Sequence, residues 1–148
     1  MESFDVTIIG AGVVGCAVAR EASRLSLKIA VLEKELDVAC GNSSRNTGML
    51  HAGFTYAPGS LKAACAVEGN QEFVQVAREL DVPFKRTGKL VVGFDEKDRE
   101  NILKFKKIGE INGVRGMEMI DRKRMDEIDP NAGGNFAMYV PSSGILDP

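Results

Sequence analysis

The sequence predicts an α/β fold that opens with a strand, a glycine-rich turn, a helix and a second strand, and three observations carry this prediction. The apolar run 6–9 leads directly into a turn of the form G-x-G-x-x-G over residues 10–15. Apolar residues then recur at helical spacing at Val14, Val18, Ala22 and Leu25. Residues 28–32 predict a second buried strand, in which the apolar run 29–32 follows Lys28 and ends at Glu33. This order predicts the opening part of a Rossmann-like domain of the FAD/NAD(P)-binding kind.

Each part of this turn has a separate physical role. Gly10 permits the tight passage from strand to helix, Gly12 lets the main chain approach a pyrophosphate, and Gly15 lets the helix pack closely on the strand. The helix N-terminus supplies free N–H donors for phosphate. Glu33 is placed to accept hydrogen bonds from ribose hydroxyls and would repel a 2′-phosphate, which disfavours NADP. The alternative for Glu33 is a solvated charge in the run 33–35.

The bulk composition indicates a water-soluble globular protein. The chain has 148 residues, 44% of them hydrophobic, and 19 basic against 21 acidic residues give a net charge of −2. Nucleic acid is therefore not expected as a partner, and no apolar run reaches the length of a transmembrane segment. We expect a cytoplasmic protein, with peripheral attachment to a membrane left open. One histidine and three scattered cysteines predict no metal site.

The pattern changes after Glu33. Residues 37–60 are rich in glycine, serine and asparagine and predict a long loop, which suits contact with an anionic ligand better than a plain linker. Ser60 is expected to cap a helix over 61–80, and Asp95 a helix that ends at 112–113. Strands are expected over 88–94, 117–120 and 136–140, the last as the final strand, with a short helix over 122–128.

The order of these elements predicts two parts. No further βαβ unit follows Glu33, so the nucleotide-binding domain is incomplete. We therefore expect residues 1–80 to be the Rossmann-like portion with its loop and following helix. Residues 81–148 would be part of an α+β substrate-binding domain. The chain is expected to be an N-terminal fragment of a longer enzyme.

These residues resemble the D-amino-acid-oxidase-like superfamily of FAD-dependent oxidoreductases, in the branch that holds glycerol-3-phosphate dehydrogenase and L-2-hydroxyglutarate dehydrogenase. The resemblance covers essentially the whole chain and is carried by segments 5–15, 31–34, 44–53, 58–63, 67–70, 83–86 and 144–148. It implies that FAD is the cofactor. The implied contacts to the pyrophosphate are Gly10, Gly12, Val13, Val14, Gly15, Ser43 and Ser44. Glu33 would contact the ribose and Lys34 the adenine. The implied contacts to the flavin ring are Thr47, Gly48, Met49 and Leu50.

The resemblance also implies a reaction, in which a secondary alcohol beside an anionic group gives a hydride to flavin. Glycerol 3-phosphate is the favoured substrate and L-2-hydroxyglutarate the first alternative. An amine or amino-acid oxidase of the same superfamily and a non-catalytic nucleotide-binding piece also stay open. Members of the family complete the FAD site with a late glycine-rich segment that this sequence lacks. The chain alone is therefore expected to be inactive.

His51 is the candidate for the proton transfer that accompanies hydride removal. It is the only histidine in the sequence, and the ordinary pKa of imidazole suits proton transfer near neutral pH. It could instead orient the flavin or serve packing alone. The substrate anion needs a cation, for which Arg45 and Lys62 are candidates, and Tyr56 could line the pocket. Arg45 could instead contact the flavin phosphates or be a surface charge of the loop, and Lys62 could be an ordinary exposed helix residue. The electron acceptor after flavin stays open among oxygen, a quinone and a partner subunit.

Overall fold

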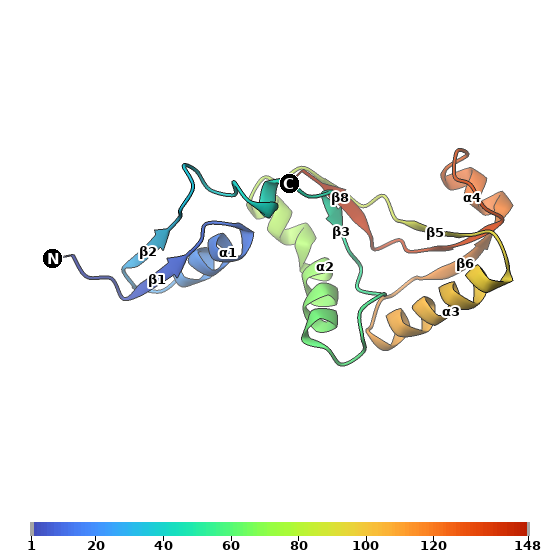
Figure 1. Ribbon diagram of the computed structural model, residues 1–148, viewed down its shortest axis with the longest axis horizontal. Helices are drawn as coiled ribbons and strands as arrows, with labels where there is room; N and C mark the ends of the chain where they lie inside the picture. Colours follow the sequence, from blue (N-terminus) through green and yellow to red (C-terminus); the bar gives the residue numbers. More distant parts are fainter. Residues whose placement is uncertain (1, 148) are drawn as a thin grey trace. The chain divides into compact units, whose positions relative to one another are not determined.

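The computed structural model describes residues 2–147, which form two compact units (Figure 1). The N-terminal unit comprises residues 2–47 and the C-terminal unit residues 48–147. The division comes earlier than residue 80, where we predicted a domain boundary, because the helix over residues 61–79 packs within the C-terminal unit. The boundary at residue 80 stays a prediction, since compactness alone does not assign a segment to a domain of a longer protein.

The N-terminal unit has the predicted strand–turn–helix–strand order. Strand β1 (Val6–Ile9) pairs in parallel with β2 (Ile29–Leu32), with Val6 opposite Ile29, and helix α1 (Val13–Ala22) connects them. A parallel pair needs such a crossover because the chain must return to the same end of the sheet. The Asp5 carboxylate accepts a hydrogen bond from the Lys28 N–H at 2.8 Å and closes the start of the pair. A short 3₁₀ turn, η1 (Asn42–Ser44), follows in the loop.

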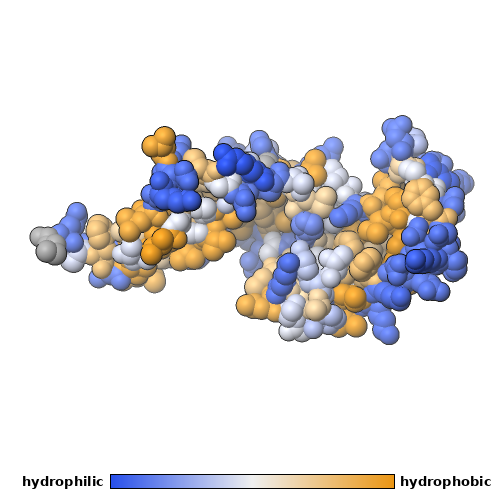
Figure 2. Space-filling view, in the orientation of Figure 1, coloured by the Kyte–Doolittle hydropathy of each residue, from blue (hydrophilic) through white to orange (hydrophobic). Residues whose placement is uncertain are grey.

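The apolar face predicted for α1 is largely exposed within this unit. Val14 is 74% exposed and Val18 50%, and Leu32 at the end of β2 is 56% exposed. Figure 2 shows part of the apolar surface of the molecule in orange. In the described N-terminal unit the sheet has only β1 and β2, which offer too little surface to cover the helix. The periodicity therefore predicted the helix correctly but not its burial.

Two antiparallel sheets form the C-terminal unit over residues 48–147. In one, β8 (Gly144–Leu146) lies between β3 (Met49–Leu50) and β4 (Phe84–Lys85); in the other, β7 (Phe136–Tyr139) lies between β5 (Leu90–Gly93) and β6 (Glu118–Asp121). The expectation that the strand near 136–140 is the last one is wrong, because β8 follows it. Residues 144–146, whose sequence is typical of a turn, form a strand because their backbone pairs with β3 and β4.

Helices pack on both faces of the sheet β5-β7-β6. Along β7, Phe136 and Met138 join a core cluster with Ile102 of α3 (Glu96–Ile111), whereas Ala137 packs with Met125 of α4 (Arg122–Ile128). Successive strand residues point to opposite faces, so α3 and α4 cover opposite sides of this sheet (Figure 1). Because β7 is covered on both faces, its residues do not alternate between buried and exposed positions.

The predicted helix caps are present. The Ser60 hydroxyl accepts from the Ala63 N–H at 3.2 Å at the start of α2 (Leu61–Glu79), and Asp95 accepts from the Asp98 N–H at 2.9 Å at the start of α3. At Gly69, inside α2, a Cβ would meet no described atom within 4 Å, so no neighbouring element packs closely on the helix at this glycine. Over residues 2–147, no helix is both long and apolar enough to span a bilayer.

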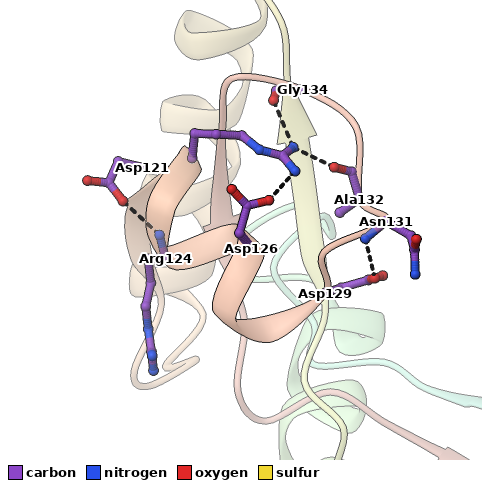
Figure 3. Close-up of polar contacts among 8 residues, drawn as sticks. Asp121, Arg124, Asp126, Asp129, Asn131, Ala132 and Gly134 are labelled. Atoms are coloured by element: carbon purple, nitrogen blue, oxygen red, sulfur yellow. Dashed lines mark hydrogen bonds and ion pairs between the residues drawn. The ribbon is translucent and has the colours of Figure 1, made fainter.

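Helix α4 is tied to the loop that precedes β7. Its cap, Asp121, accepts from the Arg124 N–H at 2.9 Å, and the Arg122 guanidinium forms an ion pair with Asp126. The same guanidinium donates to main-chain carbonyls of the loop, those of Ala132 and Gly134. Figure 3 shows these contacts. The Arg122 guanidinium thus connects α4 to the loop that precedes β7.

Candidate functional site

The glycine-rich turn is tight, and the helix that follows packs closely against it. Gly10 has a φ of +97°, a backbone conformation that residues with a Cβ rarely adopt. A Cβ at Gly15 would lie 1.9 Å from the Gly10 carbonyl oxygen. Helix α1 therefore packs against the turn at a distance that only glycine permits. These observations agree with the roles predicted for Gly10 in the turn and for Gly15 in helix–strand packing.

Main-chain donors gather at the start of α1. Gly12 is the N-cap residue, in extended conformation, and no side chain caps the helix through it. The N–H groups of the first helical turn, which begins with Val13 and Val14, have no acceptor inside the helix and carry the positive end of its dipole. The Val13 N–H donates to the Ser43 hydroxyl oxygen at 2.9 Å. This leaves the Ser43 hydroxyl proton free to be donated to an anion.

Gly12 lies against Ser43. A Cβ at Gly12 would lie 3.1 Å from the Ser43 hydroxyl oxygen, tighter than an ordinary contact. The loop 37–47 therefore returns to the turn and places a hydroxyl beside the helix N-terminus. Ser44, predicted beside it as a pyrophosphate contact, donates its own hydroxyl to the Ala39 carbonyl at 2.8 Å.

Glu33 holds the turn from the end of β2. One carboxylate oxygen accepts from the Ala11 N–H at 2.7 Å, and the other accepts from the N–H groups of Lys34 at 2.8 Å and Glu35 at 3.1 Å. These hydrogen bonds, that from Ala11 above all, lower the pKa of Glu33 below its ordinary value. Glu33 is therefore an ordered anion joined to the glycine-rich turn, which the solvated-charge alternative did not anticipate.

These groups line one cleft of the N-terminal unit, with a volume of about 470 Å³. Of the predicted site residues, its walls include Gly10, Gly12, Glu33, Lys34, Ser43 and Arg45. Arg45, which we placed with the substrate, lies in this cleft, where its guanidinium donates to the Cys40 carbonyl at 2.6 Å. Phosphate oxygens would meet backbone N–H donors, a hydroxyl and a guanidinium here, which is the donor set that a pyrophosphate needs.

The other predicted residues follow in the C-terminal unit, after Thr47 ends the first. Gly48 opens the unit, and Met49 and Leu50 form β3, paired antiparallel with β8. His51 comes next and is exposed, whereas residues 52–54 are buried. Within the described chain, no hydrogen-bond partner is found for the imidazole of His51. Its ring is thus available to a ligand while its main chain is anchored.

Tyr56 and Lys62 lie together. The Lys62 ammonium is 4.6 Å from the centroid of the Tyr56 ring, a cation–π contact. The Tyr56 carbonyl accepts from the Asn112 side-chain amide at 2.9 Å, and the same amide donates to the Gly53 carbonyl at 3.0 Å. The loop after His51 is therefore held by Asn112, the C-cap residue of α3, a contact that the sequence did not indicate.

Two further residues near this loop were missed. Lys89 at the start of β5 lies with its ammonium 3.4 Å from the Met49 sulfur. Asn70 is a buried amide on α2 whose side chain donates to the His51 carbonyl at 3.0 Å. Asn70 belongs to one of the segments that carried the family resemblance. The sequence alone does not indicate which main-chain carbonyl an asparagine in a helix will donate to. Among residues 2–147, no cluster of three His, Cys, Asp or Glu side chains could hold a metal ion.

Comparison with known proteins gives consistent matches. A family model described as FAD dependent oxidoreductase matches residues 5–148. The chain is 42% identical over 147 residues to glycerol 3-phosphate dehydrogenase of Caloramator mitchellensis, covering 98% of this chain and 31% of that protein. It is 39% identical over 149 residues to mitochondrial L-2-hydroxyglutarate dehydrogenase of Caenorhabditis briggsae, covering 99% of this chain and 34% of that protein. The chain thus spans about a third of the length of these relatives.

Solved structures show the same fold. L-alpha-glycerophosphate oxidase from Mycoplasma pneumoniae, dithionite-reduced and with FAD bound, matches with a TM-score of 0.91 at 28% identity, over 100% of this chain and 40% of that one. Glycine oxidase from Geobacillus kaustophilus matches with a TM-score of 0.84 at 23% identity, over 97% of this chain and 40% of that one. At that lower identity the second match supports the fold alone.

Proposed function

Because the chain belongs to the FAD dependent oxidoreductase family, we propose that its glycine-rich turn binds the pyrophosphate of FAD and that the full-length protein oxidises a secondary alcohol beside an anionic group. The observation that carries this proposal is the cleft in which Gly10, Gly12, Ser43 and Arg45 bring phosphate donors together. When bound, FAD supplies the hydride acceptor for the reaction.

In this proposal the N-terminal unit recognises the dinucleotide in two ways. The first-turn N–H groups of α1, the Ser43 hydroxyl and the Arg45 guanidinium face the phosphates. The Glu33 carboxylate, already ordered by the Ala11 N–H at 2.7 Å, keeps lone pairs for the ribose hydroxyls. Lys34 lines the same cleft and would lie beside the adenine. Thr47, Gly48, Met49 and Leu50 would run past the flavin ring.

His51 is the proposed acceptor of the hydroxyl proton. The exposed ring follows β3 directly, and the buried residues 52–54 fix the main chain on its other side. A neutral imidazole can take a proton near neutral pH, and general-base catalysis typically contributes about 10²–10⁴ in rate. The substrate anion would be met by a cation of the C-terminal unit, for which Lys62 with its neighbour Tyr56 is the candidate. Arg45 is reassigned in this proposal to the cofactor.

Glycerol 3-phosphate is the proposed substrate, and L-2-hydroxyglutarate is the second candidate. The support is the order of the relatives, at 42% and 39% identity for proteins with those two names. Both molecules carry a secondary hydroxyl beside an anionic group, so both suit the same proton acceptor and a cationic pocket. Phosphate and carboxylate differ in charge and size, and the substrate test therefore uses both.

The test is anaerobic reduction of the flavin in the FAD-loaded full-length protein. Glycerol 3-phosphate is expected to bleach the flavin absorbance, faster than L-2-hydroxyglutarate does and without response to glycine or other amines. In H51A the flavin should be retained, with reduction slowed by about 10²–10⁴. Bleaching by amines but by neither alcohol would contradict the proposal. Equal reduction rates in H51A and wild type would remove His51 from the chemistry.

A further inference from the structure

A buried amide on α2 anchors the main chain of the proposed proton acceptor. The Asn70 side chain is only 4% exposed, and its Nδ2 donates both to the His51 carbonyl and to the Ser142 carbonyl, each at 3.0 Å. In sequence, His51 lies 19 residues and Ser142 72 residues away from Asn70. One side chain therefore joins the residue after β3 to the loop before β8.

The orientation of that amide is set by Arg86. The Arg86 Nη1 donates to the Asn70 Oδ1 at 3.1 Å and also to the Ser142 carbonyl, and Nη2 donates to the Asn70 main-chain carbonyl at 2.6 Å. An arginine has donors only, so the amide oxygen must face it. The NH₂ group is thereby turned toward His51. Arg86 thus decides which end of the amide meets the His51 carbonyl.

His51 needs such an anchor because it lies just beyond regular structure. Strand β3 ends at Leu50, so the sheet holds the chain only up to the preceding residue. The next fixed points are the buried residues 52–54 and the Asn112 amide, which donates to the Gly53 carbonyl at 3.0 Å. The bond from Asn70 closes the gap between these supports. It holds the peptide from which the His51 side chain projects.

We propose that Asn70 is a positioning residue for His51 and that Arg86 keeps the Asn70 amide in the donating orientation. The proposal rests on the proposed function for the role of His51, and it adds the means by which the ring is placed. Proton transfer is sensitive to placement, since a displacement of about 1 Å can cost on the order of 10²-fold in rate. Neither Asn70 nor Arg86 touches the substrate in this account.

The variant N70D separates donation from packing. Aspartate keeps the volume of asparagine and still accepts from Arg86, but its ionised carboxylate has no proton to donate. The His51 carbonyl then loses the Asn70 donor and faces a negative charge, whereas the Ser142 carbonyl keeps its hydrogen bond from Arg86. The matched control is N101D, the same change at an exposed asparagine of α3.

The first measurement is nuclear magnetic resonance of the 148-residue chain. Because His51 is the only histidine, its ring gives a single set of signals, whose chemical shifts and line width report its surroundings directly. Backbone order parameters for residues 50–53 are expected near about 0.85 in wild type and N101D, and below about 0.6 in N70D. The ring signals of His51 should move in N70D alone. Unchanged order parameters and unchanged ring signals in N70D would overturn the proposal.

The variant R86Q decides the matter if N70D does not fold. Arg86 is exposed, so its replacement leaves the core intact, and R115Q is the control because Arg115 lines the same 310 Å³ pocket beside Asn70. We expect mobility at residues 50–53 in R86Q and none in R115Q. Equal mobility in these two variants would overturn the role of Arg86 and, where N70D is unfolded, the proposal as a whole.

Flavin reduction in the FAD-loaded full-length protein supplies an independent readout. In N70D the limiting reduction rate should fall on the order of 10²-fold while the FAD affinity stays that of wild type, a split that a general loss of folding would not give. If no alcohol reduces the wild-type flavin, the proposed function fails, and the order parameters still decide whether Asn70 positions His51. If wild type is active and N70D equally so, the positioning role fails alone.

Discussion

Replacing Gly15 by alanine tests the glycine-rich turn with the smallest possible perturbation. A Cβ built on Gly15 lies 1.9 Å from the Gly10 carbonyl oxygen, 3.1 Å from the Gly10 carbonyl carbon and 3.4 Å from the Ile8 side chain. The nearest of these atoms belongs to the main chain of the turn, so no rotation of a side chain can relieve the contact. Helix α1 and the turn must move apart in G15A.

The size of the effect follows from that distance. Ordinary van der Waals contact begins near 3.4 Å, so the two backbones must separate by about 1.5 Å. Overpacking a well-packed site typically costs about 1–3 kcal/mol, and a clash between main-chain segments belongs at the upper end of that range. If the turn relaxes out of its phosphate-binding shape, about 3 kcal/mol of lost binding energy corresponds to an affinity for FAD reduced by roughly 10²-fold.

The assay is a titration of the apoprotein with FAD, followed by the quenching of flavin fluorescence. The control is G69A, the same chemical change in α2, where the added Cβ meets no described atom within 4 Å. Alanine should stabilise that helix by about 0.5–1 kcal/mol, with FAD affinity unchanged. Wild-type FAD affinity in G15A, with the fold intact by circular dichroism, would refute this view of the turn.

Three further predictions concern pH and stability. Main-chain donors, the Ala11 N–H first, lower the pKa of Glu33 below its ordinary value of 4.5, so its contribution to stability is complete above that value and is lost as the pH falls through the lower folded pKa. Urea unfolding as a function of pH should show this acid-dependent loss in wild type and not in E33Q. M125A removes a fully buried side chain and should lower the free energy of unfolding by about 2–5 kcal/mol in urea; a loss well under 1 kcal/mol would mean that this core is loosely packed. D95A removes the acceptor for the Asp98 N–H and should cost about 1 kcal/mol, measured as a lower Tm, and an unchanged Tm would contradict the capping role.

The parts of the fold that could be predicted from sequence are those with local causes. The φ of +97° at Gly10 and the contact at Gly15 constrain residues within one turn of the chain, and the spacing of the glycines records that constraint. The caps at Ser60 and Asp95 have the same character, since each side chain meets a main-chain N–H three residues later. Such features leave a pattern that a single sequence shows.

Strand pairing in the C-terminal unit could not be predicted in the same way. Strands β3, β4 and β8 have two or three residues each, too few for a period, and β8 becomes a strand because residues far away in sequence pair with it. Strand β7 is buried on both faces, so alternation carries little information there. The exposed Val14 and Val18 show the same limit, because burial depends on what surrounds a helix.

At the candidate site, residue types could be predicted but their partners could not. The contact of Glu33 with a ribose stays a prediction, and in the structure its carboxylate accepts a hydrogen bond from the Ala11 N–H, which the sequence did not indicate. Arg45 was a candidate for the substrate anion or for a flavin phosphate, because a loop cation suits either, and it lies in the cleft of the glycine-rich turn. Asn70 had no predicted role, because its contact with His51 depends on the packing of α2 against the segment that follows β3.

The most direct test of the central claim is to map, residue by residue, where FAD binds to the chain labelled with ¹⁵N. The account predicts saturable shifts of the backbone signals of Gly10, Gly12, Glu33 and Ser43, which share one cleft of the N-terminal unit. If FAD at saturating concentration leaves these four signals in place, or moves only signals from other parts of the chain, the cleft is not the site of the dinucleotide.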